Sequence, residues 1–406
     1  MNIQILDGGG VTTPKGFLAG SAMAGVKTPG RYDVTVVCAE HAASMAAVFT
    51  TNKVKAAPVL LNMEHMKANK GKGRAVVFNS GCANACTGDK GMADAGEMAL
   101  AVAEALACAE DEVLVASTGV IGAYLPMDKI RPGIGTAAAA LDAEGGATAA
   151  KAIMTTDVVP KEIAVEINVA GSKVKFGAMA KGSGMIHPNM ATLLAMVTTD
   201  CAIEPALLQE ALREACAATL NMVTIDGDTS TNDSLFALAN GKAGNSPLKS
   251  STDSGYTEFL EGLTCVCQCL AKMIAKDGEG ASKVIEVKVE GAKTLTDARL
   301  AARAVVGSSL LKAAIYGKDA NWGRILCAMG YSGADFDPDI VDLYIGDVRM
   351  MDRGKALLFD EEKALVWLEK DEVQILAKLN QGDGTATAWG CDLTHEYVTI
   401  NGSYRS

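Results

Sequence analysis

Thr192 stands at the junction of the sequence that most strongly suggests chemistry. It follows the glycine-rich stretch KGSGMIHPNMA and begins the apolar segment TLLAMV. A threonine can act alone as a nucleophile when its own α-amino group, with a pKa of about 8, serves as the base. That amine exists only if the peptide bond between Ala191 and Thr192 is cut, so the sequence must also supply a way of cutting it.

The segment before Thr192 has features that self-cleavage needs. A hydroxyl held against the preceding carbonyl can attack it, giving an N-to-O acyl shift that ester hydrolysis completes. The small side chain of Ala191 leaves that carbonyl open to attack. The glycines and Pro188 allow the unusual backbone conformations that such strain requires. From the residues alone, self-processing is a hypothesis, and an ordinary strand-initiating threonine is the alternative.

Other catalytic motifs are absent from the sequence. None of the histidines lies in a GxSxG, HExxH or HRD context, which argues against a serine hydrolase, a zinc protease or a kinase. The histidines are His41, His65, His187 and His395. His187 adjoins the Thr192 segment, but a lone loop histidine usually faces solvent. The KGSGMI segment lacks the GxxxxGK[ST] spacing of a phosphate loop.

The acidic turn DGDTSTNDS, residues 226–234, resembles a calcium loop only superficially. An EF-hand needs glycine at its sixth position and glutamate at its twelfth, where this chain has Thr231 and Ala237. The turn can still organise a site through side-chain hydrogen bonds, with Asp228 and Asn232 as candidates.

The cysteines do not predict a metal site. The segment TCVCQCL places Cys265, Cys267 and Cys269 two residues apart, which we interpret as one buried face of a strand and which suits tetrahedral zinc poorly. Cys82 and Cys86 lack a second CxxC motif or a histidine pair, so we treat them as structural. No metal is predicted.

The elements that must position Thr192 alternate between strands and helices without regular βαβ spacing. This order favours an α+β or layered sandwich within the α/β class over a doubly wound parallel sheet. Strand patterns occur at residues 33–60, 75–81, 112–122, after 192, and 284–291, and strand and turn also fill the last third. Helix patterns occur at residues 89–108, 204–220 (with Pro205 in the first turn) and 297–317.

Composition limits the possible partners. The chain has 406 residues, 49% of them hydrophobic and only 5% aromatic, with a net charge of −11. This charge argues against binding to nucleic acid or to an anionic membrane, which both need clustered positive charge. We expect no signal peptide, no membrane span and reduced thiols, and therefore a cytoplasmic protein.

Many segments spread over the chain resemble the ArgJ family, the glutamate N-acetyltransferases or ornithine acetyltransferases of arginine biosynthesis. The segments that carry the resemblance are PKGFLAGSAMAGVK, AAVFTTNKVKAAPV, NSGCANACTG, ASTGVIG, IMTTDVVPK, KGSGMIHPNMATLL, DGDTSTND, DGEGASK, GKDANWGRI and INGSYRS. The junction MATLL after KGSGMI is specific in this combination, although no single segment would suffice.

The resemblance implies self-cleavage between Ala191 and Thr192. It would give an alpha chain, residues 1–191, and a beta chain, residues 192–406, which begins with the nucleophile Thr192. The implied fold is an αββα sandwich of the DmpA/ArgJ-like, N-terminal-nucleophile-like type. Thr118 and Gly119 would stabilise the developing oxyanion. The implied substrate-binding residues are Thr155, Lys181, Thr192, Glu279, Asn401 and Ser406.

The implied reaction moves acetyl from N2-acetylornithine to L-glutamate by a ping-pong scheme through an acetyl-threonine ester. Some members of the family also use acetyl-CoA, and we expect this bifunctional form. The implied assembly is an α2β2 heterotetramer of the enzyme's own chains, and no cofactor is implied. The alternative is a self-processing aminopeptidase or amidohydrolase, in which water replaces the amino acceptor.

Three positions depart from the family pattern. Cys82 replaces a usual Asn, Val158 replaces a common Thr, and Ser406 replaces a frequent terminal Thr while keeping the hydroxyl. The first two put loop hydrogen bonding near the site in doubt, but none is a nucleophile or oxyanion position.

Overall fold

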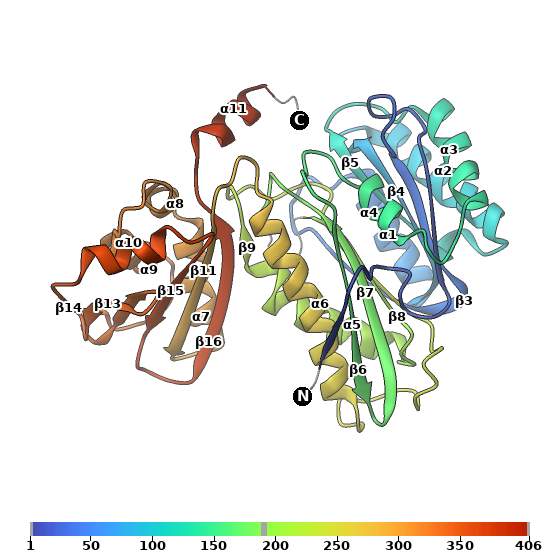
Figure 1. Ribbon diagram of the computed structural model, residues 1–406. Coiled ribbons are helices and arrows are strands. Elements are labelled where there is room, and N and C mark those ends of the chain that lie inside the picture. The colour runs from blue at the N-terminus through green and yellow to red at the C-terminus, as the bar shows by residue number, and fades with distance from the viewer. Residues whose placement is uncertain (1–2, 188–192, 404–406) are drawn as a thin grey trace.

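The structure is a computed structural model that describes residues 3–187 and 193–403. Its strands form two sheets, one of nine strands and one of seven, that define a first and a second lobe (Figure 1). No helix among the described residues is long and apolar enough to cross a membrane.

The nine-stranded sheet has the order β1-β6-β7-β8-β10-β3-β4-β5, with β2 paired to β3. Its strands are β1 (Gln4–Leu6), β2 (Phe17–Ala22), β3 (Val34–Phe49), β4 (Lys72–Cys82), β5 (Val113–Val120), β6 (Lys161–Val169), β7 (Ser172–Lys181), β8 (Leu194–Thr199) and β10 (Ser234–Ala239). The predicted strands at residues 75–81 and 112–122 and the one after Thr192 are therefore confirmed.

The long strand β3 divides this sheet into two layers. Its first part, from Val34, pairs with β2 and β4, whereas its second part, ending at Phe49, pairs with β10. The register shifts between Cys38 and Ala43, where the two parts meet. Side chains of β4 and β5 share one buried cluster with side chains of β7, β8 and β10, so the layers pack face to face. Phe78 and Phe236 meet there edge to face, with ring centroids 5.9 Å apart.

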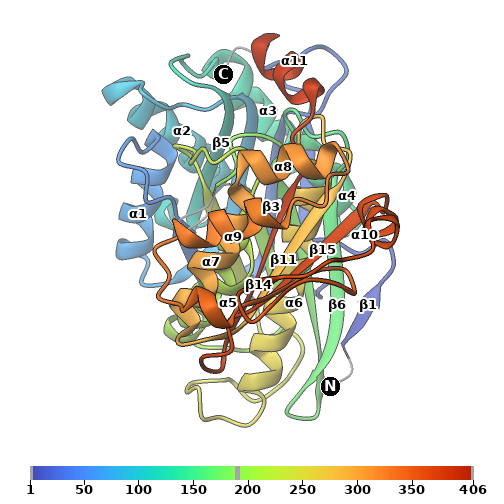
Figure 2. The ribbon, with the colours of Figure 1, turned by 90° about the vertical axis from the view of Figure 1, so that its left-hand side faces the viewer.

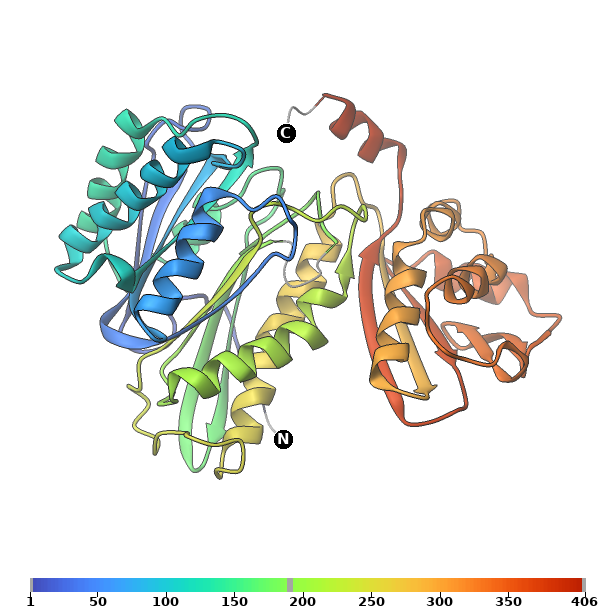
Figure 3. The ribbon, with the colours of Figure 1, turned by 180° about the vertical axis from the view of Figure 1, so that it is seen from behind.

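Helices cover both outer faces of these layers (Figures 1 and 3). On one side α5 (Pro205–Ala218) and α6 (Tyr256–Lys276) pack on the layer of β6, β7, β8 and β10. On the other side α2 (Gly88–Leu106) and α3 (Met127–Ala139) pack on β2 to β5, with α1 (Ala57–Ala68) beside them. The short α4 (Gly146–Ala152) contributes to the interior. The predicted αββα sandwich is confirmed, with both layers belonging to one continuous sheet.

One predicted element was wrong in type, and two others were right in type but differ in their bounds. The cysteines of TCVCQCL lie on helix α6, where Phe259, Leu263 and Val266 recur at helical spacing and face the core. Positions two apart are roughly 200° apart around a helix, so Cys267 is buried while its two neighbours are partly exposed.

Residues 57–60 begin helix α1, with Pro58 in its first turn, and do not continue the strand pattern. The helix predicted at residues 297–317 divides into α7 (Leu295–Gly307) and α8 (Ser309–Tyr316), because the Ser308 side chain caps the second one.

The second lobe holds the seven-stranded sheet, in the order β14-β13-β12-β15-β11-β16-β9. Its strands are β9 (Val223–Thr224), β11 (Val284–Ala292), β12 (Asp342–Ile345), β13 (Val348–Asp352), β14 (Lys355–Ala356), β15 (Glu372–Lys378) and β16 (Gly384–Cys391). Helices α7, α8, α9 (Trp322–Gly330), α10 (Glu361–Leu368) and the last helix α11 (His395–Ser403) accompany it. In the part of the last third that the structure describes, helices α10 and α11 thus occur in addition to the strand and turn that were predicted.

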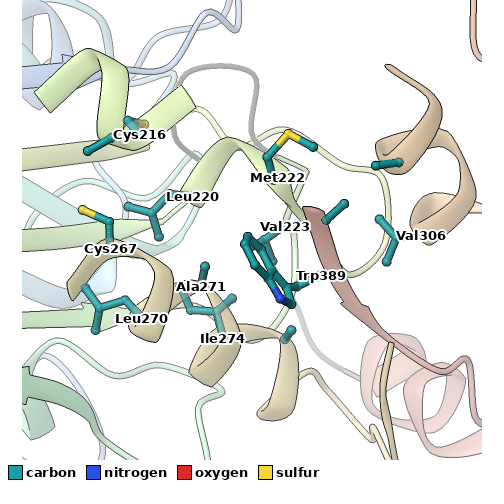
Figure 4. Close-up of a cluster of buried hydrophobic side chains, with 14 of the residues drawn as sticks. Cys216, Leu220, Met222, Val223, Cys267, Leu270, Ala271, Ile274, Val306 and Trp389 are labelled. Atoms are coloured by element: carbon teal, nitrogen blue, oxygen red, sulfur yellow. The ribbon is translucent and has the colours of Figure 1, made fainter. Parts of the chain in front are cut away.

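A buried cluster joins the two lobes (Figure 4). The indole of Trp389, on β16, packs with Ala271 and Ile274 of α6 and with Val223 of β9, and Val306 of α7 lies nearby. Trp389 is 2% exposed, and its indole N–H donates to Glu286 Oε2 at 2.8 Å. Burial of such a side chain contributes a few kcal/mol, which fixes the second sheet against helix α6.

Candidate active site

One pocket of about 250 Å³ lies where β5 and β7 end and where β8 and β10 begin. Its lining includes the predicted residues Thr118, Gly119, Thr155, Lys181, Glu279 and Asn401. Segments from both lobes and from helix α11 therefore converge on it. The predictions for Ala191, Thr192 and Ser406 fall outside the described residues.

Gly119 at the end of β5 is fixed by a close approach to β4. Its φ is +131°, and a Cβ built on it would lie 2.3 Å from the carbonyl carbon of Gly81. In the sheet register Gly81 and Gly119 are direct partners. Only glycine fits here, so the backbone of Thr118 and Gly119 reaches the pocket wall in one defined position.

The acidic turn predicted to organise a site holds this strand end in place. Asn232 Nδ2 donates to the carbonyl oxygens of Ala83 at 2.6 Å and Ser117 at 2.9 Å. Its own Oδ1 accepts from Thr231 Oγ1 at 2.6 Å. All four residues are buried, so the turn locks the end of β5 to the loop after β4. Asp228 and Asn232 both line the pocket.

A buried ion network lies beneath the pocket. Asp157 Oδ1 accepts from Lys161 Nζ and from the Gly182 backbone, both at 2.7 Å, and its Oδ2 accepts from the Thr155 backbone at 3.0 Å. Lys161 is fully buried and also donates to Asp277 Oδ2 at 2.6 Å. Asp157 thus ties Thr155 to the chain that leaves β7.

Lys181 adds its charge to this network. Burial would raise the pKa of Asp157, but the charges of Lys181 and Lys161 together lower it to about 2. Burial lowers the pKa of Lys181, and attraction to Asp157 opposes that effect. Within the described residues, the Lys181 ammonium forms no salt bridge of 4 Å or less. It lines the pocket as a cation that can receive a carboxylate.

The chain on either side of residues 188–192 is held by separate partners. Asp226 accepts from the backbone of Met185 at 2.6 Å and Ile186 at 2.9 Å. Met185 has a φ of +54°, an uncommon conformation for a residue with a side chain. Beyond the gap, the Ser234 backbone N–H donates to the Leu193 carbonyl at 2.9 Å. Both flanks of the predicted cleavage point are therefore fixed to the turn at residues 226–234.

His187 joins the two lobes. Arg303 donates to His187 Nε2 at 3.1 Å, so in the neutral ring Nδ1 carries the proton and donates to Thr224 Oγ1 at 2.9 Å. Burial, and next the charge of Arg303, lower the pKa of His187. His187 is not part of the described pocket lining. Its contacts with Thr224 and Arg303 hold the loop after β7 against the second lobe.

Glu279 and helix α11 form the outer wall. Glu279 is 7% exposed, and its Oε2 accepts from Asn401 Nδ2 at 2.8 Å. A Cβ built on Gly184 would lie 2.3 Å from the same oxygen, so the loop passes close against the Glu279 side chain. Helix α11 has no buried residue and extends past the second sheet (Figures 1 and 2). Its place in the pocket depends on such polar contacts.

Two further acidic residues of the pocket, Asp226 and Asp233, belong to the turn that was predicted to organise a site but were not themselves predicted to take part. Asp233 is 2% exposed. Burial raises the pKa of Asp233 well above its ordinary value, while hydrogen bonding from Ser230 and the charge of Lys181 act in the opposite direction. Polar turn sequences usually lie in solvent, so the burial of Asp233 became apparent only from the fold. Among the described residues, no group of three or more His, Cys, Asp or Glu is arranged to hold a metal ion.

Two positions that depart from the family pattern have plain structural roles. The buried Cys82 thiol donates to the Ala123 carbonyl at 3.3 Å, and burial raises its pKa. Val158 is 80% exposed and lies outside the described pocket lining. Neither change alters the pocket wall.

Comparison with known proteins agrees with these motifs. The model of the ArgJ family matches residues 18–406. The arginine biosynthesis bifunctional protein ArgJ of Symbiobacterium thermophilum is 56% identical, over 98% of this chain and 99% of its own. The protein of that name from Caldanaerobacter subterraneus subsp. tengcongensis is 51% identical over the full length of both.

Among solved structures, the ornithine acetyltransferase of Mycobacterium tuberculosis, in complex with ornithine, is 44% identical. It covers 47% of this chain and 100% of that chain, with a TM-score of 0.44. The match of the family model and the two full-length relatives lead to one conclusion: the chain belongs to the ArgJ family.

Proposed function

We propose that this chain moves an acetyl group from N2-acetylornithine to L-glutamate through an acetyl ester on Thr192. As a member of the ArgJ family it is an acyltransferase of arginine biosynthesis. The observation that carries the proposal is the pocket itself, in which Thr118, Lys181 and Glu279 line one cavity although they come from distant segments.

The charges of the pocket suit amino-acid substrates. Both substrates carry an α-carboxylate, for which the buried Lys181 ammonium is a counter-charge. The buried Glu279 carboxylate suits the δ-ammonium of ornithine, and Asn401 holds that carboxylate in place. Thr155 and Ser406 complete the proposed contacts to the substrate.

In the proposed reaction the α-amino group of Thr192 takes the proton of its own hydroxyl. The oxygen then attacks the acetyl carbonyl, and the Thr118 hydroxyl and the Gly119 N–H stabilise the negative charge that develops. One well-placed donor of this kind contributes roughly 3 kcal/mol. Glutamate then takes the acetyl group from the ester, and Thr192 is restored.

The free amine requires cleavage between Ala191 and Thr192, which gives chains 1–191 and 192–406. Support comes from hydrogen bonds that fix the chain on both sides of this peptide bond. On one side Asp226 accepts from the Met185 backbone, and on the other the Leu193 carbonyl accepts from the Ser234 backbone. We further propose an α2β2 assembly in the cytoplasm. The word bifunctional in the names of the relatives supports acetyl-CoA as a second donor.

Intact mass under denaturing conditions, combined with an acetyl-transfer assay, tests the proposal. The wild type should give two fragments that meet at residues 191 and 192, and Thr192→Ala should remain one chain without activity. Thr136→Ala, an exposed hydroxyl on α3, serves as the matched control and should behave as wild type. A wild-type chain that stays uncut after long incubation would refute the proposal. Release of acetate from N2-acetylornithine at the same rate with and without glutamate would establish a hydrolase instead.

A further inference from the structure

Asp233 lines the pocket, but the reaction proposed above assigns no role to its carboxyl group. It lies just before β10, and the next residue in the chain, Ser234, pairs with Leu194 at the start of β8. Asp233 lines the pocket and is buried, yet its Oδ2 has no hydrogen-bond partner within the described residues. An unpartnered buried carboxyl oxygen destabilises the fold, so a fold that keeps one in a pocket points to a ligand.

The charges around Asp233 set its protonation. Lys181, from β7, is the cation that acts on it, and Ser230 donates to it from its own turn. Asp226, Asp228 and Glu279 also line the pocket and add negative charge to it. Burial raises the pKa of Asp233 well above the ordinary value, which favours the neutral acid. The pocket therefore presents a carboxylic acid, which can give a proton and then, as the carboxylate, take one back.

The proposed acetyl transfer needs a group of this kind at the nitrogen of the substrate. The departing nitrogen of N2-acetylornithine must gain a proton as its bond to the acetyl carbon breaks. The incoming glutamate arrives as an ammonium ion and must lose a proton before it can attack. Because both substrates react through an α-nitrogen at one site, a single acid–base group can serve both halves of the reaction.

We propose that Asp233 is a further catalytic residue, which gives a proton to the departing amine and takes one from the incoming amine. This inference rests on the proposed function. In the first half the threonine hydroxyl proton goes to the Thr192 α-amine, the C–N bond breaks, and Asp233 protonates the nitrogen and becomes a carboxylate. The released amine takes one proton from water.

The second half restores the starting state. The Asp233 carboxylate takes a proton from the glutamate ammonium, and the free amine attacks the ester carbonyl. The ester C–O bond breaks, and the threonine oxygen recovers its proton from the Thr192 ammonium. The new amide nitrogen gives its surplus proton to water, which balances the proton taken in the first half.

Substrates that need no proton transfer at nitrogen test this assignment. p-Nitrophenyl acetate has a leaving group that departs as an anion, and hydroxylamine is largely neutral at pH 7 and attacks without a base. We compare Asp233→Asn with wild type in two assays, the exchange of acetyl between N2-acetylornithine and glutamate, and transfer from p-nitrophenyl acetate to hydroxylamine. The first kcat should fall by roughly 10²- to 10⁴-fold, whereas the second should stay within about threefold of wild type.

The asparagine has the shape of the neutral acid, so this variant should fold and cleave, which intact mass checks. Asp200→Asn is the matched control, because Asp200 is also a buried carboxyl with a raised pKa. It follows the far end of β8, roughly 20 Å from the pocket, and it should leave the ratio of the two assays unchanged.

Three outcomes overturn the assignment. Equal losses in both assays would make Asp233 structural, an unchanged exchange rate would remove it from the chemistry, and an uncut Asp233→Asn chain would place it in self-cleavage. A wild type without acetyl exchange would instead refute the proposed function, so the two failures are distinct.

Discussion

The side-chain amide of Asn401 donates to the Glu279 carboxylate, with 2.8 Å between Nδ2 and Oε2. Glu279 is buried in the loop that follows α6, whereas Asn401 lies on the exposed helix α11. This hydrogen bond attaches the last helix of the chain to the pocket. Helix α11 is therefore part of the pocket wall.

Loss of this contact should weaken substrate binding and leave the fold intact. Asn401→Ala should raise the KM for N2-acetylornithine roughly 10- to 100-fold, because a hydrogen bond to a charged group contributes about 1.5–3 kcal/mol. The melting temperature should not change, since α11 has no buried residue. Steady-state kinetics measures the effect. Val398→Ala, 67% exposed on the same helix, should keep the wild-type KM, and an equal rise in both variants would contradict the prediction.

Gly119 tests the close approach of β5 to β4. Gly119→Ala should lower kcat by roughly 10²- to 10³-fold, because the added Cβ would lie 2.3 Å from Gly81 and must displace the N–H that we propose as an oxyanion donor. Gly122→Ala is a control for backbone strain alone, since Gly122 has a φ of +80° and its Cβ would meet nothing within 4 Å. Comparable kcat values for the two variants would show that the clash is relieved without moving the donor.

Asn232 should contribute strongly to stability. Asn232→Ala leaves the buried carbonyls of Ala83 and Ser117 without their donor, at about 1–3 kcal/mol each. We expect the urea midpoint to fall clearly in equilibrium unfolding. Asn240→Ala removes two exposed hydrogen bonds, one donated to the Lys15 carbonyl and one accepted from the Lys242 backbone. It should cost less than about 1 kcal/mol, because water can replace both partners. Equal midpoints for the two variants would disprove the structural role of Asn232.

The buried network of Asp157, Lys161 and Asp277 should make the free energy of unfolding fall at low pH. The folded-state pKa of Asp157 is lowered from 3.8 to about 2, so its contribution is present above about pH 4 and is lost as the pH falls towards 2. That contribution is about 2 kcal/mol.

Lys161→Met should remove this pH-dependent contribution of Asp157. It should also destabilise the fold by about 3–5 kcal/mol at pH 7, since it leaves buried carboxylates unpaired. Urea unfolding between pH 7 and pH 3 measures both effects. Lys173→Met, which breaks an exposed pair with Glu166, should change stability by less than about 1 kcal/mol. If the Lys161→Met midpoint matched that control, the network would have no such role.

Sequence patterns predicted the parts of the fold whose burial is visible along the chain. The short strands β4, β5 and β8 were correct because they are buried on both faces and form continuous apolar runs. The helix begun by Pro205 was correct because its one buried face repeats with the helical period. The cysteines of α6 misled the prediction because Cys265, Cys267 and Cys269 imitate a strand, while the longer-range spacing of Phe259 and Leu263 marks the helix.

The residues of the candidate site also fall into those that were predicted and those that were missed. Thr118, Lys181 and Glu279 were predicted from the resemblance to the ArgJ family, and they do line one pocket. Asp233 and the network around Lys161 were missed because their meaning depends on burial. A charged residue in a polar segment looks solvent-exposed until the tertiary contacts that enclose it are known.

The strand order of the first sheet has a consequence for cleavage at Ala191. Strands β8 and β10, which follow that point, lie between β7 and β3, which precede it. Two separated chains would therefore share one hydrogen-bonded sheet and one hydrophobic interior, and neither could leave without unfolding the other. Cleavage would convert a unimolecular refolding reaction into a bimolecular one, so recovery from denaturant would become dependent on concentration. The cleaved enzyme would stay folded mainly because it unfolds slowly. Once unfolded, its two separate chains could not refold in the way that the single precursor chain does.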